Sequence, residues 1–233
     1  MTSLELFFQD GNPNSWALLV DTSSVDGALI AISPSGEILK KLSWDKSVRH
    51  SNSLLSNFLD LSSDLGKNNI KHIFFIQGPG SFTGLRVGAA FVKTLSFSLG
   101  KIPITSSSSF SSAAVTTLAS NTALKEFNIL IPSIGNKSFS AKFKLEGSIW
   151  QETISLNGAD ESALELKNKF SIFDYVDSSV QKINRNIGDL VSPFFSKTNI
   201  HAHLKTHTYL DLYPLYLRQS EAEEKNRYDK VKL

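Results

Sequence analysis

A glycine-rich stretch, residues 78–88, has the residue types and spacing that could most readily do chemistry; it reads GPGSFTGLRVG. Its glycines and its proline allow positive φ angles and a tight turn, and Ser81 or Thr83 can cap a following helix. Free N–H groups at a helix start attract anions, so a phosphate-binding loop is one interpretation. The spacing fits neither the dinucleotide motif nor the P-loop, and a strand-to-helix turn without a ligand is an equal alternative.

Two further groups of side chains could support catalysis or metal binding. Residues 106–112 are rich in serine, but with no base in view we interpret them as caps and turns at a domain junction. His201, His203 and His207 form a cluster that no cysteine or placed carboxylate completes, so we expect solvent-exposed side chains rather than a zinc site. The sequence has no cysteine and no His-Glu-x-x-His motif, and we assign no catalytic or metal-binding residue.

Hydrophobic periodicity predicts the elements that position the glycine-rich stretch. Antiparallel strands of a meander are predicted at 16–20, 27–32 and 37–44. An amphipathic helix at 50–65, closed by Gly66, precedes a strand at 72–77 that is apolar on both faces and therefore central in its sheet. The helix at 85–99 is apolar over more than one face. It should contact a second domain or another chain, or else lie inside this chain.

The pattern then repeats in a shorter form. After a strand at 102–105 and an alanine-bearing helix that ends near residue 119, further strands are predicted at 129–134, 138–145 and 149–156. A helix at 161–170 and a strand at 172–176 complete the second set. We therefore divide the chain into an N-terminal extension (1–15), a first domain (16–106), a second, smaller domain (107–217) and a charged C-terminal tail (218–233).

Composition limits the classes of function. The 233 residues are 41% hydrophobic and 20% charged, which predicts a soluble globular protein of one large or two small domains. With 24 basic against 22 acidic residues the net charge is +2, less than nucleic-acid binding alone usually shows, so RNA contact should need a partner. No apolar run approaches a membrane span, and the absence of cysteine suits the cytoplasm.

Four motifs together resemble the TsaB (YeaZ) family: VDTSS at 20–24, RHSNSLL at 49–55, GPGSFTGLRVG at 78–88 and PLYLR at 214–218. The glycine-rich motif is the specific one. The resemblance implies an α/β fold of the actin-like and Hsp70-type ATPase superfamily, with two ribonuclease-H-like domains, each with a mixed sheet, that face each other across a cleft. The two predicted meanders match that architecture.

The resemblance also implies a function. Members of the family are partners of TsaD in the synthesis of N6-threonylcarbamoyladenosine (t6A) at position 37 of tRNAs that read ANN codons, together with the ATPase TsaE. We therefore expect a cytoplasmic, non-catalytic scaffold that binds and activates TsaD and that could also form a homodimer. ATP or ADP and a divalent metal are expected on the partner subunits rather than on this chain, and tRNA only through the complex.

Comparison with TsaD supports the expectation that this chain is not an enzyme by itself. TsaD carries two histidines four residues apart, which can share a metal, whereas Ser109 and Ala113 stand at the corresponding positions here. The partner interface is predicted on the helices 50–65 and 85–99. Its residues are Leu54, Leu55, Phe58, Leu85, Gly88, Ala89 and Val92. Burying a few such side chains, at about 1.5 to 3 kcal/mol each, would dominate an interface.

The alternative class is an enzyme, a small-molecule kinase or ATPase of the same superfamily. In active members a carboxylate at the end of the first strand helps to hold the magnesium-nucleotide, and Asp21 stands there. A role of Asp21 in capping the turn is favoured, because no second glycine-rich block follows residue 129. The weak phosphate or nucleotide candidates are Asp21, Thr22, Ser23, Gly78, Gly80, Ser81 and Thr83. A direct RNA-binding protein is the least favoured class.

Overall fold

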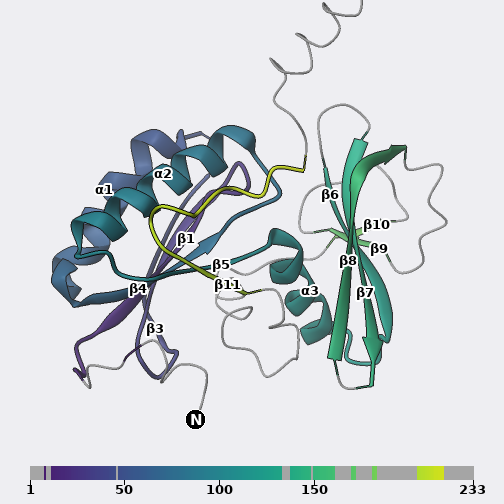
Figure 1. Cartoon of the computed structure of the whole chain (residues 1–233), viewed down its shortest axis with the longest axis horizontal. Helices are drawn as coiled ribbons and strands as arrows, with labels where there is room; N and C mark the ends of the chain where they lie inside the picture. Colours follow the sequence, from purple (N-terminus) through teal and green to yellow (C-terminus); the bar gives the residue numbers. More distant parts are fainter. Residues whose placement is uncertain are drawn as a thin grey trace, which may run out of the picture.

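In the computed structural model, which describes residues 8, 12–45, 47–132, 137–147, 149–160, 169–171, 180–182 and 204–217, these residues form two mixed β-sheets, three α-helices and a short 3₁₀ helix, Lys67–Asn69 (Figure 1). Each sheet contains an antiparallel meander that is extended on one side by parallel strands, and the outermost strand on that side of the first sheet is again antiparallel. This repeated order confirms the expected α/β fold with two ribonuclease-H-like units.

The first sheet has the strand order β11-β5-β4-β1-β2-β3. Its strands are β1 (Trp16–Asp21), β2 (Gly27–Ile32), β3 (Ile38–Trp44), β4 (Ile70–Ile76), β5 (Ile104–Ser107) and β11 (Lys205–His207). Every residue of β1 and β2 is buried, because apolar clusters pack on both faces of the sheet. The central position of β4 confirms the prediction from its continuous apolar run.

Helices α1 (His50–Leu65) and α2 (Phe82–Ser98) cover one face of the first sheet (Figure 1). Helix α1 has the predicted bounds and ends at Gly66, whose φ of 74° suits glycine. Helix α2 begins earlier than predicted because Ser81 caps it; the amide of Gly84 donates a hydrogen bond of 3.2 Å to Ser81 Oγ.

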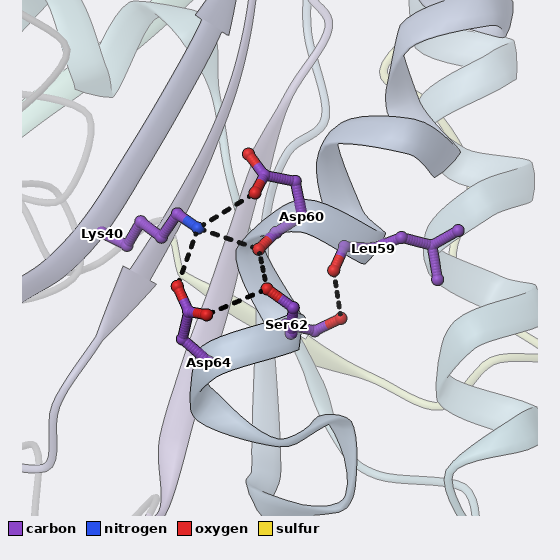
Figure 2. A network of polar contacts seen from close by, with 6 residues as sticks. Lys40, Leu59, Asp60, Ser62 and Asp64 are labelled. Carbon is purple, nitrogen blue, oxygen red and sulfur yellow. Dashed lines mark hydrogen bonds and ion pairs between the residues drawn. The ribbon is translucent and has the colours of Figure 1, made fainter.

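Lys40 ties the edge strand β3 to α1 (Figure 2). Its Nζ lies 3.2 Å from Asp60 Oδ1 and 3.2 Å from Asp64 Oδ2, and it also donates a hydrogen bond of 2.8 Å to the carbonyl oxygen of Asp60. The hydrogen bond to Asp64 is the main cause that raises the pKa of Lys40. Because these groups are open to solvent, the ion pairs fix the position of β3 more than they stabilise the fold.

The second sheet has the strand order β10-β9-β6-β7-β8. Its strands are β6 (Glu126–Pro132), β7 (Lys137–Glu146), β8 (Ile149–Asp160), β9 (Lys169–Ser171) and β10 (Val180–Lys182). Helix α3 (Ser109–Ser120) packs on this sheet and buries Phe110 against Phe127 and Phe143. Figure 1 places α3 between the two sheets.

Several predicted segments fall partly or wholly outside the described residues. Of the helix predicted at 161–170, residues 161–168 lie outside, and the last two are wrong because they belong to strand β9. The strand at 172–176 and the tail at 218–233 also lie outside. From the N-terminal extension, Phe8 packs with Leu204 on the face of the first sheet opposite α1 and α2.

Residues 204–217, here called the return strap, lie mostly on the first sheet, although the sequence placed them in the second domain; Leu217 at their end packs against the core of the second unit. Strand β11 pairs antiparallel with β5, and Leu212, 1% exposed, belongs to the core under α1 and α2. The yellow segment of Figure 1 shows this strap running along α2. A three-residue strand has too little periodicity to reveal its partner from the sequence.

Candidate functional site

The glycine-rich loop between β4 and α2 is the meeting point of three distant parts of the chain. Its hydrogen bonds run from Ser81 N to Ser23 O (2.7 Å), from Ser109 N to Gly78 O (2.8 Å) and from Leu215 N to Gln77 O (2.7 Å). The partners come from the β1–β2 loop, the start of α3 and the return strap. The VDTSS and PLYLR motifs therefore both lie against the glycine-rich motif, and the RHSNSLL motif joins the VDTSS motif through His50 and Ser24.

The β1–β2 loop lies so close to residues 78–88 that three of their glycines have no room for a side chain. A Cβ on Gly80 would overlap the carbonyl oxygen of Ser23, and a Cβ on Gly84 would overlap that of Thr22. At Gly88 a Cβ would overlap the Thr22 hydroxyl. The N–H of Ser81, one of the donors that a bound phosphate would need, is already bonded to Ser23. These contacts supply a reason for the glycines that requires no ligand.

Asp21 makes the turn contact that the sequence favoured. It is 1% exposed, and its Oδ1 accepts a hydrogen bond of 2.8 Å from the amide of Ser23. The hydroxyls of Thr22 and Ser23 are buried and have no hydrogen-bond partner within the described part of the chain. The fold thus brings the phosphate candidates of the two loops together, except Thr83, which is exposed on α2.

Six of the seven residues predicted for the partner interface lie instead in the core of the first unit. These buried residues are Leu54, Phe58, Leu85, Gly88, Ala89 and Val92. Only Leu55 is exposed, at 59%. The periodicity of an amphipathic helix identifies the side chains that face its own sheet, so the prediction selected the inward faces of both helices.

The outer surface of α1 and α2 carries a different apolar set. On α1, Leu55 and Leu59 lie one turn apart and are 59% and 56% exposed. On α2, Ala90 is exposed, and Val87 and Phe91 are half-buried. We call these five residues the α1–α2 surface. Leu59 was missed, although its spacing of four from Leu55, away from the inward stripe, is a signal that could have found it.

The return strap covers the remaining apolar flank of α2. The ring of Tyr209 lies 5.2 Å from that of Phe97, and Lys93 Nζ donates a hydrogen bond of 3.3 Å to the carbonyl oxygen of Leu212. Helix α2 therefore contacts the sheet, α1 and the strap. Part of its surplus of apolar residues, for which the sequence left several explanations open, serves contacts within this chain.

His50, the first residue of α1, links three elements. Trp44 Nε1 donates a hydrogen bond of 2.9 Å to His50 Nδ1. His50 Nε2 must then carry the hydrogen, which it donates over 2.9 Å to the carbonyl oxygen of Ser24. Gly27 is required beside this contact because a Cβ there would overlap the Trp44 ring. The contact positions the start of α1 next to the β1–β2 loop.

The positions that correspond to the TsaD histidines are deeply buried on α3. Ser109 and Ala113 are both 0% exposed. In the described ranges, no three His, Cys, Asp or Glu residues are grouped so that they could hold a metal ion. His207 is half-buried rather than solvent-exposed, and its Nε2 lies 2.8 Å from Ser106 Oγ; His201 and His203 lie outside the described residues.

Two buried titratable side chains have strongly shifted pKa values. Burial lowers the pKa of His72 on β4 to about 3, and its Nε2 lies 2.9 Å from Thr105 Oγ1. Burial raises the pKa of Glu152 on β8 to about 7, and a hydrogen bond with Ser108 opposes the rise. Both groups are held by polar partners within the fold, so the shifts alone do not mark a catalytic centre.

Comparison with known proteins gives a family match over part of the chain. The family model described as TsaD, tRNA N6-adenosine threonylcarbamoyltransferase, matches residues 46–134. No curated protein matches the sequence. The matched range contains α1, the glycine-rich loop, α2 and α3. No helix among the described residues is both long and apolar enough to cross a membrane.

Solved structures from Pseudomonas aeruginosa share the fold. YeaZ is 19% identical, with a TM-score of 0.62, and the match covers 87% of this chain and 99% of YeaZ. A second protein, described as similar to the peptidase YeaZ, is 19% identical with the same TM-score of 0.62, and the match covers 88% of this chain and all of the other. The resemblance to the TsaB (YeaZ) family is thus confirmed, as a TsaD-family match at residues 46–134 within a chain that has the fold of YeaZ.

Proposed function

We propose that this protein is a non-catalytic subunit in t6A synthesis at position 37 of ANN-decoding tRNAs, where it binds and activates a TsaD-type transferase. The family match at residues 46–134 and the YeaZ fold support this role. The observation that carries the docking step is the α1–α2 surface, which leaves Leu55 and Leu59 mostly exposed. Ser109 and Ala113, which cannot provide an imidazole pair, support the non-catalytic part.

Docking through the α1–α2 surface fits the chemistry of its side chains. Burial of the two leucines against a partner would contribute about 1 to 2 kcal/mol each, because roughly half of each side chain is still exposed. Ala90 is exposed on α2 and would let a partner helix approach closely. The inward residues act indirectly, since they hold α1 and α2 against the sheet.

In this proposal, the partner proteins supply the chemistry and the complex binds the tRNA. The chemical step, with its divalent metal and nucleotide, belongs to TsaD and TsaE, and the tRNA substrate enters through the complex. In the absence of TsaD, the same α1–α2 surface would pair two copies of this chain. The proposed compartment is the cytoplasm.

A double variant, Leu55→Asp with Leu59→Asp, tests the docking surface. Titration calorimetry with TsaD should show an affinity at least roughly 100-fold lower, because two charges would be desolvated against an apolar partner. Leu39→Asp is the matched control; Leu39 is 45% exposed on β3 and should tolerate the same change without effect. Unchanged TsaD affinity of a folded double variant would refute the proposed surface, and unchanged t6A after depletion of the protein would refute the function.

A nucleotide-dependent kinase or ATPase is the second candidate. The observation that favours it is the pair of buried, unpartnered hydroxyls of Thr22 and Ser23 beside Asp21. Calorimetry with magnesium and ATP on the isolated chain separates the two candidates. Micromolar binding with turnover would support the enzyme, and the absence of heat would support the scaffold.

A further inference from the structure

Exposed aromatic side chains lie on α2 and on the return strap. Phe82 and Phe97 on α2 are 37% and 57% exposed, and Tyr213 and Tyr216 on the strap are 68% and 43% exposed. The rings of Phe82 and Tyr216 contact each other at a centroid distance of 5.0 Å. Large exposed rings that gather on one surface are typical of a binding site.

Two cations lie on two of these rings. Arg86 Cζ is 5.4 Å from the centroid of Phe82, and Lys93 Nζ is 4.9 Å from the centroid of Tyr213. The two cations are seven residues apart on α2, which separates them by about 10 Å along the helix. We call Phe82, Arg86, Lys93, Phe97, Tyr213 and Tyr216 the aromatic–cation ridge.

The charge of the ridge limits what can bind there. Asp211, the carboxylate nearest in sequence on the strap, accepts hydrogen bonds of 2.6 Å from both the amide and the hydroxyl of Thr208, which lower its pKa, so it stays ionised and offsets part of the positive charge. Arg86 and Lys93 still give the ridge an excess of positive charge. A second copy of this chain would bring like charges together, whereas a ligand with negative charge would be attracted.

The pairing of ring and cation favours one class of anionic ligand. A nucleotide offers a flat base for stacking and a phosphate for a cation, and the ridge contains two pairs of ring and cation. Single-stranded RNA is bound in this way, with bases on Tyr or Phe rings and the backbone beside Arg or Lys. An acidic protein surface would satisfy the cations but would leave the exposed ring faces without stacking partners.

We propose that the aromatic–cation ridge binds a single-stranded segment of RNA, with bases stacked on Tyr213 and Tyr216 and phosphates beside Lys93 and Arg86. The ridge extends from α2 onto the return strap, and Ala90 of the α1–α2 surface lies one turn from both Arg86 and Lys93. Two cations give weak binding by themselves, which agrees with the near-neutral net charge of the chain. The proposal rests on the proposed function only for the identity of the RNA.

The test is fluorescence anisotropy of a short, labelled oligouridylate with the full chain, measured over a range of salt concentrations. Tyr213→Leu should weaken binding roughly 5- to 100-fold, because one stacked base is lost. Tyr213→Trp keeps a ring and should bind at least as tightly as the wild type. Arg86→Gln should make the slope of the logarithm of the binding constant against the logarithm of the salt concentration less steep by about 0.7, which is the contribution of one phosphate on a single strand. Leu39→Ser, on β3, is the control and should change neither quantity.

The outcomes test the RNA-binding proposal independently of the proposed docking through the α1–α2 surface. Salt-independent or undetectable binding by the wild type would overturn it, as would equal affinity of Tyr213→Leu and Tyr213→Trp. If Tyr213→Leu instead weakens TsaD binding without changing RNA binding, the ridge is a protein interface and the RNA proposal is wrong. Circular dichroism must show native secondary structure for every variant; Tyr213 is 68% exposed, so its replacement should leave the fold intact.

Discussion

The amide of Ser81 donates a hydrogen bond of 2.7 Å to the carbonyl oxygen of Ser23. This single contact joins the glycine-rich loop to the β1–β2 loop, and it requires Gly80 because any side chain there would overlap Ser23. The most specific sequence motif of the chain therefore has a structural purpose in the folded monomer. Its contribution to the proposed docking is to hold the start of α2 in place.

Gly80→Ala should destabilise the protein strongly. The new methyl group meets backbone atoms, which cannot rotate away as a side chain can, so we expect a loss of at least about 2 kcal/mol in the free energy of unfolding. Gly147→Ala is the control: its φ of 64° is strained for alanine but no atom lies within 4 Å, and the loss should be about 1 kcal/mol. Urea denaturation measures both. Equal losses would show that the Ser23 contact does not constrain Gly80.

Acid should destabilise the fold through His72. The folded chain keeps this imidazole neutral, with a pKa of about 3, whereas the unfolded chain protonates it below pH 6.5. The free energy of unfolding therefore falls as the pH drops from 6.5 towards 3, by up to about 4 kcal/mol. His72→Gln keeps a polar partner for Thr105 and should remove this part of the pH dependence. Parallel wild-type and variant profiles in urea would contradict the assignment.

Glu152 should act in the opposite direction. Its pKa rises from 4.5 to about 7 on folding, so the folded chain holds a proton that the unfolded chain has lost over that range. The free energy of unfolding therefore falls as the pH rises from 4.5 to 7. Glu152→Gln should be more stable than the wild type at pH 8, by about 1 to 3 kcal/mol, and equally stable near pH 4. Thermal unfolding at both pH values measures the difference; a gain of the same size at both would exclude titration as its cause.

The return strap should be essential for stability of the first unit. Leu212→Ala opens a cavity under α1 and α2 and should cost about 2 to 5 kcal/mol. Leu210→Ala, two residues away and 65% exposed, should cost no more than about 0.5 kcal/mol. Hydrogen exchange should show faster opening of β5 in the first variant only. If both variants melt at the same temperature, the strap does not contribute to the core.

The sequence predicted local structure well where the signals were local. The bounds of α1 followed from the spacing of its leucines and from Gly66, and the turn role of Asp21 followed from its place at the end of the first apolar run. Failures occurred where the deciding contact was remote. Lys205 and Ser106, which pair between β11 and β5, are separated by almost half the length of the chain, and no sequence pattern near either residue predicts this pairing.

The sequence predicted the two helices of the proposed docking surface, but it did not predict which side of each helix is exposed. Periodicity found the helices α1 and α2 but selected Leu54 and Val92, which face the sheet, because the strongest apolar stripe is the one that a helix buries. Leu59 follows Phe58 in the sequence and Tyr213 follows Leu212, but Phe58 and Leu212 are buried whereas Leu59 and Tyr213 are exposed. Only the fold assigns Leu59 to the α1–α2 surface and Tyr213 to the aromatic–cation ridge.

The pairing of β11 with β5 has a consequence for biosynthesis. As the polypeptide leaves the ribosome, the outer edge of β5 has no partner until residues 205–207 emerge, after the whole of the second sheet has been made. An unpaired strand edge is prone to association with other chains. The N-terminal half therefore cannot finish folding ahead of the rest, and nascent chains that stall before the last thirty or so residues should be preferred clients of chaperones.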